Sequence, residues 1–138
     1  MISSRTRWDG RSLAGRVKGL RATLVVTALL FGFSAASGHA FLDRADPRVG
    51  STVKIAPTQV RVWFTERLEA AFSTLEVFDE RGERVDDGPP RTDESSPDML
   101  QVPLKAIGPG TYRVKWRVLS VDTHVTEGDF TFRVTGDP

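Results

Sequence analysis

The chain has 138 residues, a formal net charge of +1 and no cysteine. Its length allows one domain besides a targeting segment, and a domain of about 100 residues can be stable around a single core without disulfides. The charge is unevenly distributed, because residues 1–38 contain six basic residues and one acidic residue, which leaves 13 basic and 17 acidic residues after them. The remaining domain has a net charge of −4, which argues against nucleic acid as a partner.

Residues 1–38 have the layout of a secretory signal peptide. Basic residues come first, the apolar run from Ala22 to Phe33 follows, and the small-residue stretch SAASG occupies positions 34–38. The apolar run has 12 residues, fewer than the ~20 that a membrane-spanning helix needs, so a membrane anchor is the less favoured alternative. We therefore expect export to a periplasmic or extracellular location, with residues 39–138 as the functional domain.

The expected cleavage follows Gly38 and makes His39 the first residue of the exported chain. Small residues then occupy the positions that cleavage requires, with Ala36 and Gly38 nearest the cut. Two other cuts satisfy the same rule, one leaving Ser37 first and the other leaving Phe41 first. The choice matters because only the first cut gives His39 a free α-amine.

The sequence after His39 is typical of short β-strands. Apolar and polar residues alternate with a period of two in the segments 59–64, 111–118 and 129–134, which predicts antiparallel strands buried on one face. The expected core residues are Tyr112, Val114, Trp116, Phe130 and Phe132. Weaker strand candidates are residues 41–44, 74–79, 83–85 and 99–104.

Turn-forming segments separate these strands. The polar stretch 86–98, rich in Pro, Asp and Ser, is expected to form an exposed loop whose carboxylates are surface charges. Residues 66–72 are expected to form one helical turn or a crossing loop, and no longer helix is predicted. About seven short strands at roughly ten-residue spacing predict an all-β fold, a Greek-key β-sandwich.

The two histidines, His39 and His124, are the residues that suggest chemistry. Asp122 lies two positions before His124, so in extended backbone both side chains project to the same side. Copper(II) and zinc(II) accept nitrogen and oxygen donors together. The pair is therefore either half of a metal site or an aspartate that only orients a histidine in a loop.

A cut before His39 would complete the donor set. The first residue would then offer an α-amine, with a reference pKa of ~7.7–8.0, and an imidazole to one metal. Together with His124 and Asp122 this gives three nitrogens and one oxygen, a set that suits the tetragonal geometry of Cu(II). Zinc would more often be held by a tetrahedral set.

Several motifs in this order resemble the CopC family of periplasmic copper-binding proteins. The resemblance covers residues 39–138, and its motifs are HAF (39–41), DPRVG (46–50), FTE (64–66), GTYRVKWRVLS (110–120) and DTH (122–124). It implies an immunoglobulin-like or cupredoxin-like sandwich that binds Cu(II) through His39, Asp122 and His124. The family also has a glutamate near this site, here Glu66, as a ligand or a neighbouring partner. The alternative for Glu66 is a surface salt bridge.

The chain departs from some family members in its thioether content. Those members carry a methionine-rich loop with a further histidine that binds Cu(I), whereas this chain has only Met1, Met99 and its two histidines. Val125 stands where the family often has proline. We therefore expect one Cu(II) per chain and no Cu(I) site.

The family resemblance implies copper resistance, sequestration or delivery, with a CopD-like inner-membrane protein as a partner, and no enzymatic activity. Two alternatives remain open from the sequence. One is a copper monooxygenase of the histidine-brace type, which also uses an N-terminal histidine. The other is a metal-free exported sandwich that serves as an interaction module.

Overall fold

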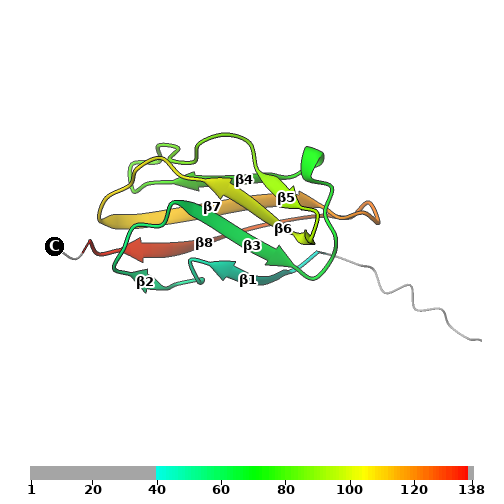
Figure 1. Cartoon of the computed structure of the whole chain (residues 1–138), viewed down its shortest axis with the longest axis horizontal. Helices are drawn as coiled ribbons and strands as arrows, with labels where there is room; N and C mark the ends of the chain where they lie inside the picture. The colour runs from blue at the N-terminus through cyan, green and yellow to red at the C-terminus, as the bar shows by residue number, and fades with distance from the viewer. Residues whose placement is uncertain (1–39, 137–138) are drawn as a thin grey trace, which may run out of the picture. The chain divides into compact units, whose positions relative to one another are not determined.

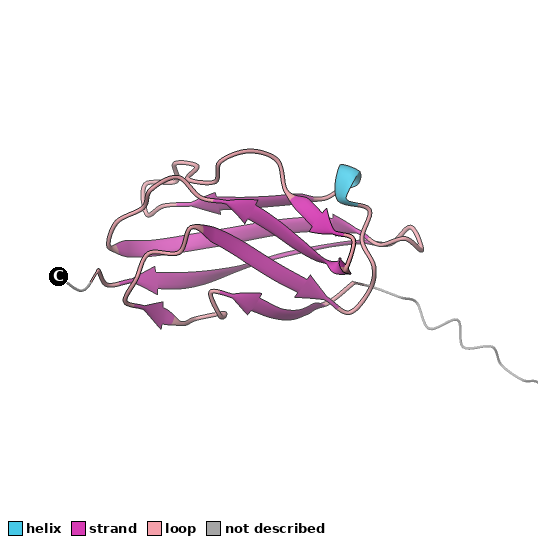
Figure 2. Cartoon of the chain, viewed as in Figure 1, coloured by secondary structure: helices cyan, strands magenta, loops and turns pink. Residues whose placement is uncertain are grey.

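The structure is a computed structural model that describes residues 40–136. The predicted signal peptide, its cleavage site and His39 lie outside these residues. The strands are β1 (Leu42–Asp46), β2 (Thr52–Val53), β3 (Gln59–Phe64), β4 (Thr74–Phe78), β5 (Arg91–Asp93), β6 (Ser96–Pro103), β7 (Gly110–Leu119) and β8 (Val125–Val134). Within the described residues the helical element is a 3-10 turn, Ala70–Phe72 (Figure 2).

The strands form two sheets of four, which pack face to face (Figure 1). One sheet has the order β1-β3-β6-β5 and the other the order β2-β8-β7-β4. The long hairpin β7–β8 is antiparallel along its whole length, whereas the short β2 runs parallel to β8. Non-consecutive neighbours mean that the chain crosses between the sheets, as in a Greek-key sandwich. The predicted fold class is confirmed.

The faces predicted for β7 are also confirmed. Tyr112, Val114 and Val118 are buried between the sheets, and the intervening basic side chains are exposed. Trp116 is partly buried and packs against this core, with its ring 5.2 Å from that of Phe64 in an edge-on arrangement. The alternation with a period of two therefore predicted correctly which face of this strand is buried.

The short edge elements differ from the prediction. Residues 86–98 contain β5 and the start of β6, rather than one exposed loop. Residues 83–85 contain one isolated bridge, from Arg84 to Phe78, instead of a strand, and residues 66–72 contain the single predicted helical turn. Strands of two or three residues, such as β2 and β5, are too short for a periodic pattern to reveal them.

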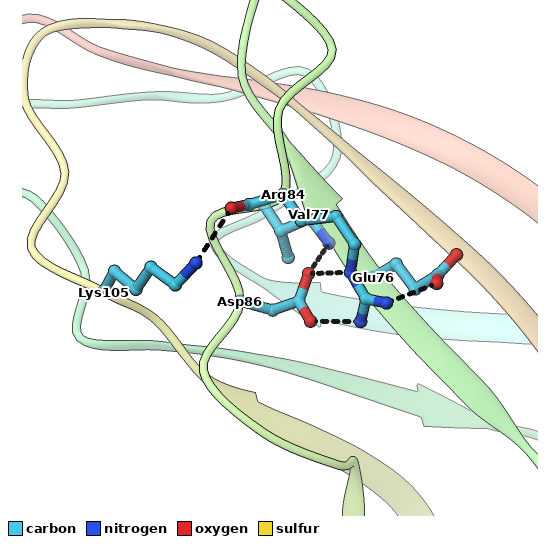
Figure 3. A network of polar contacts seen from close by, with 5 residues as sticks. All are labelled: Glu76, Val77, Arg84, Asp86 and Lys105. Atoms are coloured by element: carbon cyan, nitrogen blue, oxygen red, sulfur yellow. Dashed lines mark hydrogen bonds and ion pairs between the residues drawn. The ribbon is translucent and has the colours of Figure 1, made fainter.

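Asp86 is a buried charge, although the sequence placed it among surface carboxylates (Figure 3). Its side chain is 1% exposed and lies 2.5 Å from a terminal guanidinium nitrogen of Arg84. It also accepts the backbone N–H of Val77 at 2.9 Å. Burial alone would raise the pKa of Asp86, but the hydrogen bonds from Arg84 and Val77 hold that pKa below its usual value. These contacts fasten the segment after β4 to β4 itself.

A candidate metal site at one end of the sandwich

The loop that joins β7 to β8 packs against the segment that leaves β3. The N–H of Glu69 donates to the carbonyl of Leu119 at 2.8 Å, and the N–H of Val121 donates to the carbonyl of Arg67 at 3.0 Å. In Figure 1 the β7–β8 loop, the 3-10 turn and the start of β1 lie at the same end of the described domain. The DTH motif therefore lies at this end, on a loop that backbone hydrogen bonds attach to the segment after β3.

The turn itself is a three-residue hairpin loop. The N–H of Ser120 donates to the carbonyl of His124 at 3.0 Å, and the N–H of Thr123 donates to the carbonyl of Ser120 at 2.9 Å. Thr123 has a φ of 72°, the left-handed conformation that usually closes such loops and that glycine or asparagine normally supplies. A β-branched residue in this conformation is strained. The turn thus has an unusual residue at the position between the two candidate donors.

Asp122 and His124 are brought together by this turn. Oδ2 of Asp122 lies 3.2 Å from Nδ1 of His124, and their side chains are 38% and 42% exposed. The sequence predicted that both would project to one side because of an extended backbone. The structure brings them together for a different reason, since the residue between them has a left-handed rather than an extended conformation.

The aspartate is also fixed from its other side. The hydroxyl of the buried Ser120 donates to Oδ1 of Asp122. This hydrogen bond, followed by the contact with His124, lowers the pKa of Asp122. The carboxylate is therefore ionised near neutral pH, as a metal donor must be. The sequence analysis did not single out Ser120, although its position two residues before an aspartate was the available signal.

The separation of the two donors fits a shared metal ion. Two donors at bond lengths of about 2.0–2.2 Å from one metal, at angles between a right angle and tetrahedral, lie about 2.8–3.6 Å apart. The observed separation of Oδ2 and Nδ1 is 3.2 Å. Within residues 40–136, no three His, Cys, Asp or Glu side chains are assembled as a metal cluster. Glu66, on the segment that leaves β3, is therefore not part of such a cluster.

The start of the described chain lies beside this turn. Ala40 is fully buried, and its carbonyl accepts a hydrogen bond from the hydroxyl of Thr126 at 2.6 Å. Phe41 and Thr65 exchange backbone and hydroxyl hydrogen bonds, with the N–H of Thr65 donating to the carbonyl of Phe41 at 2.9 Å. Ala40 is thus fixed next to Thr126, at the beginning of β8. Thr126 is two residues after His124 in the sequence.

Fold and site together define an all-β sandwich that presents a carboxylate and an imidazole on an end loop. The family model described as the CopC domain matches residues 42–135. The chain belongs to the CopC family, whose functions are copper binding and copper resistance. For residues 40–136, no helix is long and apolar enough to cross a membrane.

Individual relatives agree with this assignment. The chain is 32% identical over 123 residues to Protein YobA of Escherichia coli K12, which covers 88% of this chain and 99% of that protein. It is 30% identical over 125 residues to Copper resistance protein C of Xanthomonas campestris pv. juglandis, covering 85% and 96% of the two chains. The crystal structure of CopC from Methylosinus trichosporium OB3b superposes with a TM-score of 0.69 at 31% identity, covering 72% of this chain and 97% of that one.

Proposed function

We propose that this protein is exported and holds one Cu(II) per chain through the amine and imidazole of His39, the carboxylate of Asp122 and the imidazole of His124. The observation that carries the proposal is the exposed donor pair of Asp122 and His124, 3.2 Å apart. Residues 1–38 are the signal peptide in this proposal, and residues 39–138 are the copper-binding domain.

The fixed position of Ala40 supports the participation of His39. Consecutive Cα atoms are 3.80 Å apart across a trans peptide bond, so the residue before Ala40 begins within that distance of it. The Ala40 carbonyl accepts a hydrogen bond from the hydroxyl of Thr126. Thr126 is two residues after His124, and two residues of β-strand span only about 7 Å. An N-terminal residue attached there has a short path to the turn.

The donor types favour Cu(II) as the cargo. Three nitrogens and one carboxylate oxygen form the mixed set that suits a tetragonal Cu(II) ion, and Cu(II) leads the affinity order of the first-row divalent metals. Thioether ligands for Cu(I) are scarce, because Met99 is the single methionine of the described residues and is buried. Glu66 remains a candidate for a contact near the metal, because the carbonyl of the neighbouring residue Arg67 accepts a hydrogen bond from Val121 in the turn.

The exposure of the site favours binding and transfer over catalysis. Asp122 and His124 are each more than one-third exposed, so another protein can approach the metal and exchange ligands with it. A carboxylate in the donor set also fills a position that a copper monooxygenase would need for oxygen. We therefore infer a periplasmic or extracellular copper carrier, for resistance or delivery, with a CopD-like membrane protein as its partner.

Copper titration of the domain that begins at His39 tests this function. We expect one Cu(II) per chain, held against a competing chelator, with an electron paramagnetic resonance spectrum of a tetragonal nitrogen and oxygen field. A stoichiometry of two, or the small hyperfine coupling of a blue-copper thiolate site, would refute the proposed donor set. Peroxide consumption with a polysaccharide present would instead favour the monooxygenase.

A further inference from the structure

Ser120 is the buried residue in contact with the donor pair. The residue is 1% exposed, and its backbone bridges to Leu68 on the neighbouring segment. Its N–H donates to the carbonyl of His124 at 3.0 Å, and its carbonyl accepts the N–H of Thr123 at 2.9 Å. Ser120 therefore holds both ends of the three-residue loop.

The direction of its hydroxyl proton follows from the acceptors around it. Oγ of Ser120 lies close to Oδ1 of Asp122 and 3.1 Å from the carbonyl oxygen of His124. A hydroxyl has one proton to donate, and the carbonyl of His124 already accepts the N–H of Ser120. The carboxylate is the stronger acceptor, since hydrogen bonds to an ionised oxygen are shorter and stronger. The proton therefore goes to Asp122.

This hydrogen bond distinguishes the two oxygens of Asp122. Oδ1 is engaged by Ser120, whereas Oδ2 is the oxygen that faces Nδ1 of His124 at 3.2 Å. A carboxylate held in this way can offer one oxygen to a metal beside the imidazole, but it cannot readily turn to offer both. Hard ions such as Ca²⁺ collect six to eight oxygen ligands and often use both carboxylate oxygens, so this arrangement disfavours them.

We propose that Ser120 is a positioning residue that makes Asp122 a one-oxygen donor and keeps the pair of Asp122 and His124 preformed before copper arrives. The inference rests on the proposed function, because it assigns Ser120 a role toward the same site. It goes beyond the donor set by naming the residue that selects which carboxylate oxygen faces the metal.

Ser120→Ala tests the inference, with Ser73→Ala as its matched control. Ser73 is also a buried serine near the end of β7, and its hydroxyl donates to the carbonyl of Glu69 at 2.9 Å and accepts the N–H of Leu119 at 3.1 Å. It makes no contact with Asp122. Both substitutions remove one buried hydroxyl, but only Ser120→Ala releases the carboxylate.

Three measurements apply to each variant of the domain that begins at His39. Chelator competition should show a roughly 10–100-fold loss of Cu(II) affinity for Ser120→Ala, the usual effect of removing a partner outside the metal ligands. Its paramagnetic resonance parameters should also shift, and Ser120→Thr, which keeps the hydroxyl, should restore them. Without metal, ¹⁵N relaxation should show greater mobility at residues 121–124 in Ser120→Ala alone.

The outcomes separate this inference from the proposed function. If the wild-type domain binds no Cu(II), the proposed function fails and the inference fails with it. If the wild type binds Cu(II) but Ser120→Ala retains its affinity and spectrum, only the inference fails. Equal losses in Ser120→Ala and Ser73→Ala would show a general effect of buried hydroxyls and would also overturn it.

Discussion

At the scale of single residues, Asp122 and Asp93 have similar local surroundings but different neighbours. Oδ1 of Asp93 accepts the N–H and the hydroxyl of Ser95 at 2.9 and 2.8 Å, and the pKa of Asp93 is lowered by these bonds. Asp122 has a serine hydroxyl on the same oxygen. A lowered pKa therefore does not distinguish Asp122 as a candidate metal donor. The distinguishing feature is the Nδ1 atom of His124, 3.2 Å from Oδ2 of Asp122.

Removing either donor side chain should weaken copper binding. We expect His124→Ala and Asp122→Ala each to lower Cu(II) affinity by at least about tenfold, with the larger loss for His124 because imidazole is the better donor for Cu(II). The thermal midpoint should change little, since both side chains are exposed. Chelator competition is the measurement, and Asp93→Ala is the control that should leave affinity unchanged. Unchanged copper competition in His124→Ala would remove this residue from the site.

Thr123 should limit the stability of the turn. A non-glycine residue in the left-handed region costs about 1–3 kcal/mol, and glycine would relieve this strain at an entropic cost of about 0.5–1 kcal/mol. We therefore expect Thr123→Gly to raise the free energy of unfolding by about 1 kcal/mol, measured by urea denaturation of the metal-free domain. A decrease would mean that the threonine side chain contributes more than its strained backbone costs.

Asp86 should contribute more to stability than its neighbour Asp87. Asp86→Ala leaves the buried N–H of Val77 without its side-chain acceptor, which should cost about 2 kcal/mol in the free energy of unfolding. Asp87 is exposed, so Asp87→Ala should fall within about 0.5 kcal/mol of the wild type. Equal effects of the two substitutions in urea denaturation would show that the network of Figure 3 adds nothing.

The pH dependence of this difference has a definite sign. The folded-state pKa of Asp86 is lowered, so the ionised carboxylate stabilises the fold at pH values above the ordinary aspartate pKa of ~3.9. That contribution is lost as the pH falls through the folded-state pKa. The stability gap between the wild type and Asp86→Ala should therefore be constant near neutral pH and shrink in acid.

At the scale of elements, β7 and β8 pack closely where Trp116 crosses Gly128. These residues face each other in the register of the hairpin, and a Cβ on Gly128 would lie 2.6 Å from Cζ2 of the Trp116 ring. Gly128 is therefore required because of a neighbouring side chain, and its backbone has no left-handed φ. The Trp116 ring covers this part of the hairpin and packs edge-on against the ring of Phe64, which belongs to the opposite sheet.

Substitutions at this contact should destabilise the sandwich. Gly128→Ala should cost about 1–3 kcal/mol through overpacking, whereas Gly108→Ala, where a Cβ meets open space, should be nearly neutral. Trp116→Ala should cost about 3 kcal/mol, the lower end of the range for buried aromatic residues, because Trp116 is only partly buried. If Gly128→Ala proves as harmless as Gly108→Ala, the ring must be able to move aside.

The strands with a clear alternation were predictable from the sequence, and the shortest strands were not. The segments 59–64, 111–118 and 129–134 alternate with a period of two over six to eight residues, so the existence and the buried faces of β3, most of β7 and the second half of β8 could be inferred. The strands β2 and β5 have two and three residues, and their pairing depends on longer neighbours. Asp86 was wrongly predicted to be exposed, because its burial and its contact with the N–H of Val77 depend on how the segment after β4 packs against β4.

At the scale of the whole molecule, the fold brings the start of the domain to the loop before its last strand. His39 and His124 are 85 positions apart in the sequence, yet Ala40 is hydrogen-bonded to Thr126 at the beginning of β8. The sequence could suggest the pair of Asp122 and His124 from its spacing. It could not show that a turn joins them or that Ser120 holds one carboxylate oxygen, since both depend on backbone conformation.

In the proposed function, removal of residues 1–38 should complete the site. In the uncleaved chain the nitrogen of His39 belongs to a peptide bond, and a neutral amide is a poor metal donor. Cleavage after Gly38 would turn it into an amine that binds together with the imidazole of the same residue. The precursor should therefore bind Cu(II) much more weakly than the exported domain, and should not compete for the metal before export.

The most direct test compares the domain that begins at His39 with a version carrying one extra residue before it. Both are titrated with Cu(II) against the same chelator, and circular dichroism confirms that the fold is unchanged. We expect the extended version to lose most of its affinity, because the amine no longer belongs to His39. Equal affinities would contradict the central proposal, since they would show that the N-terminal amine is not a copper ligand.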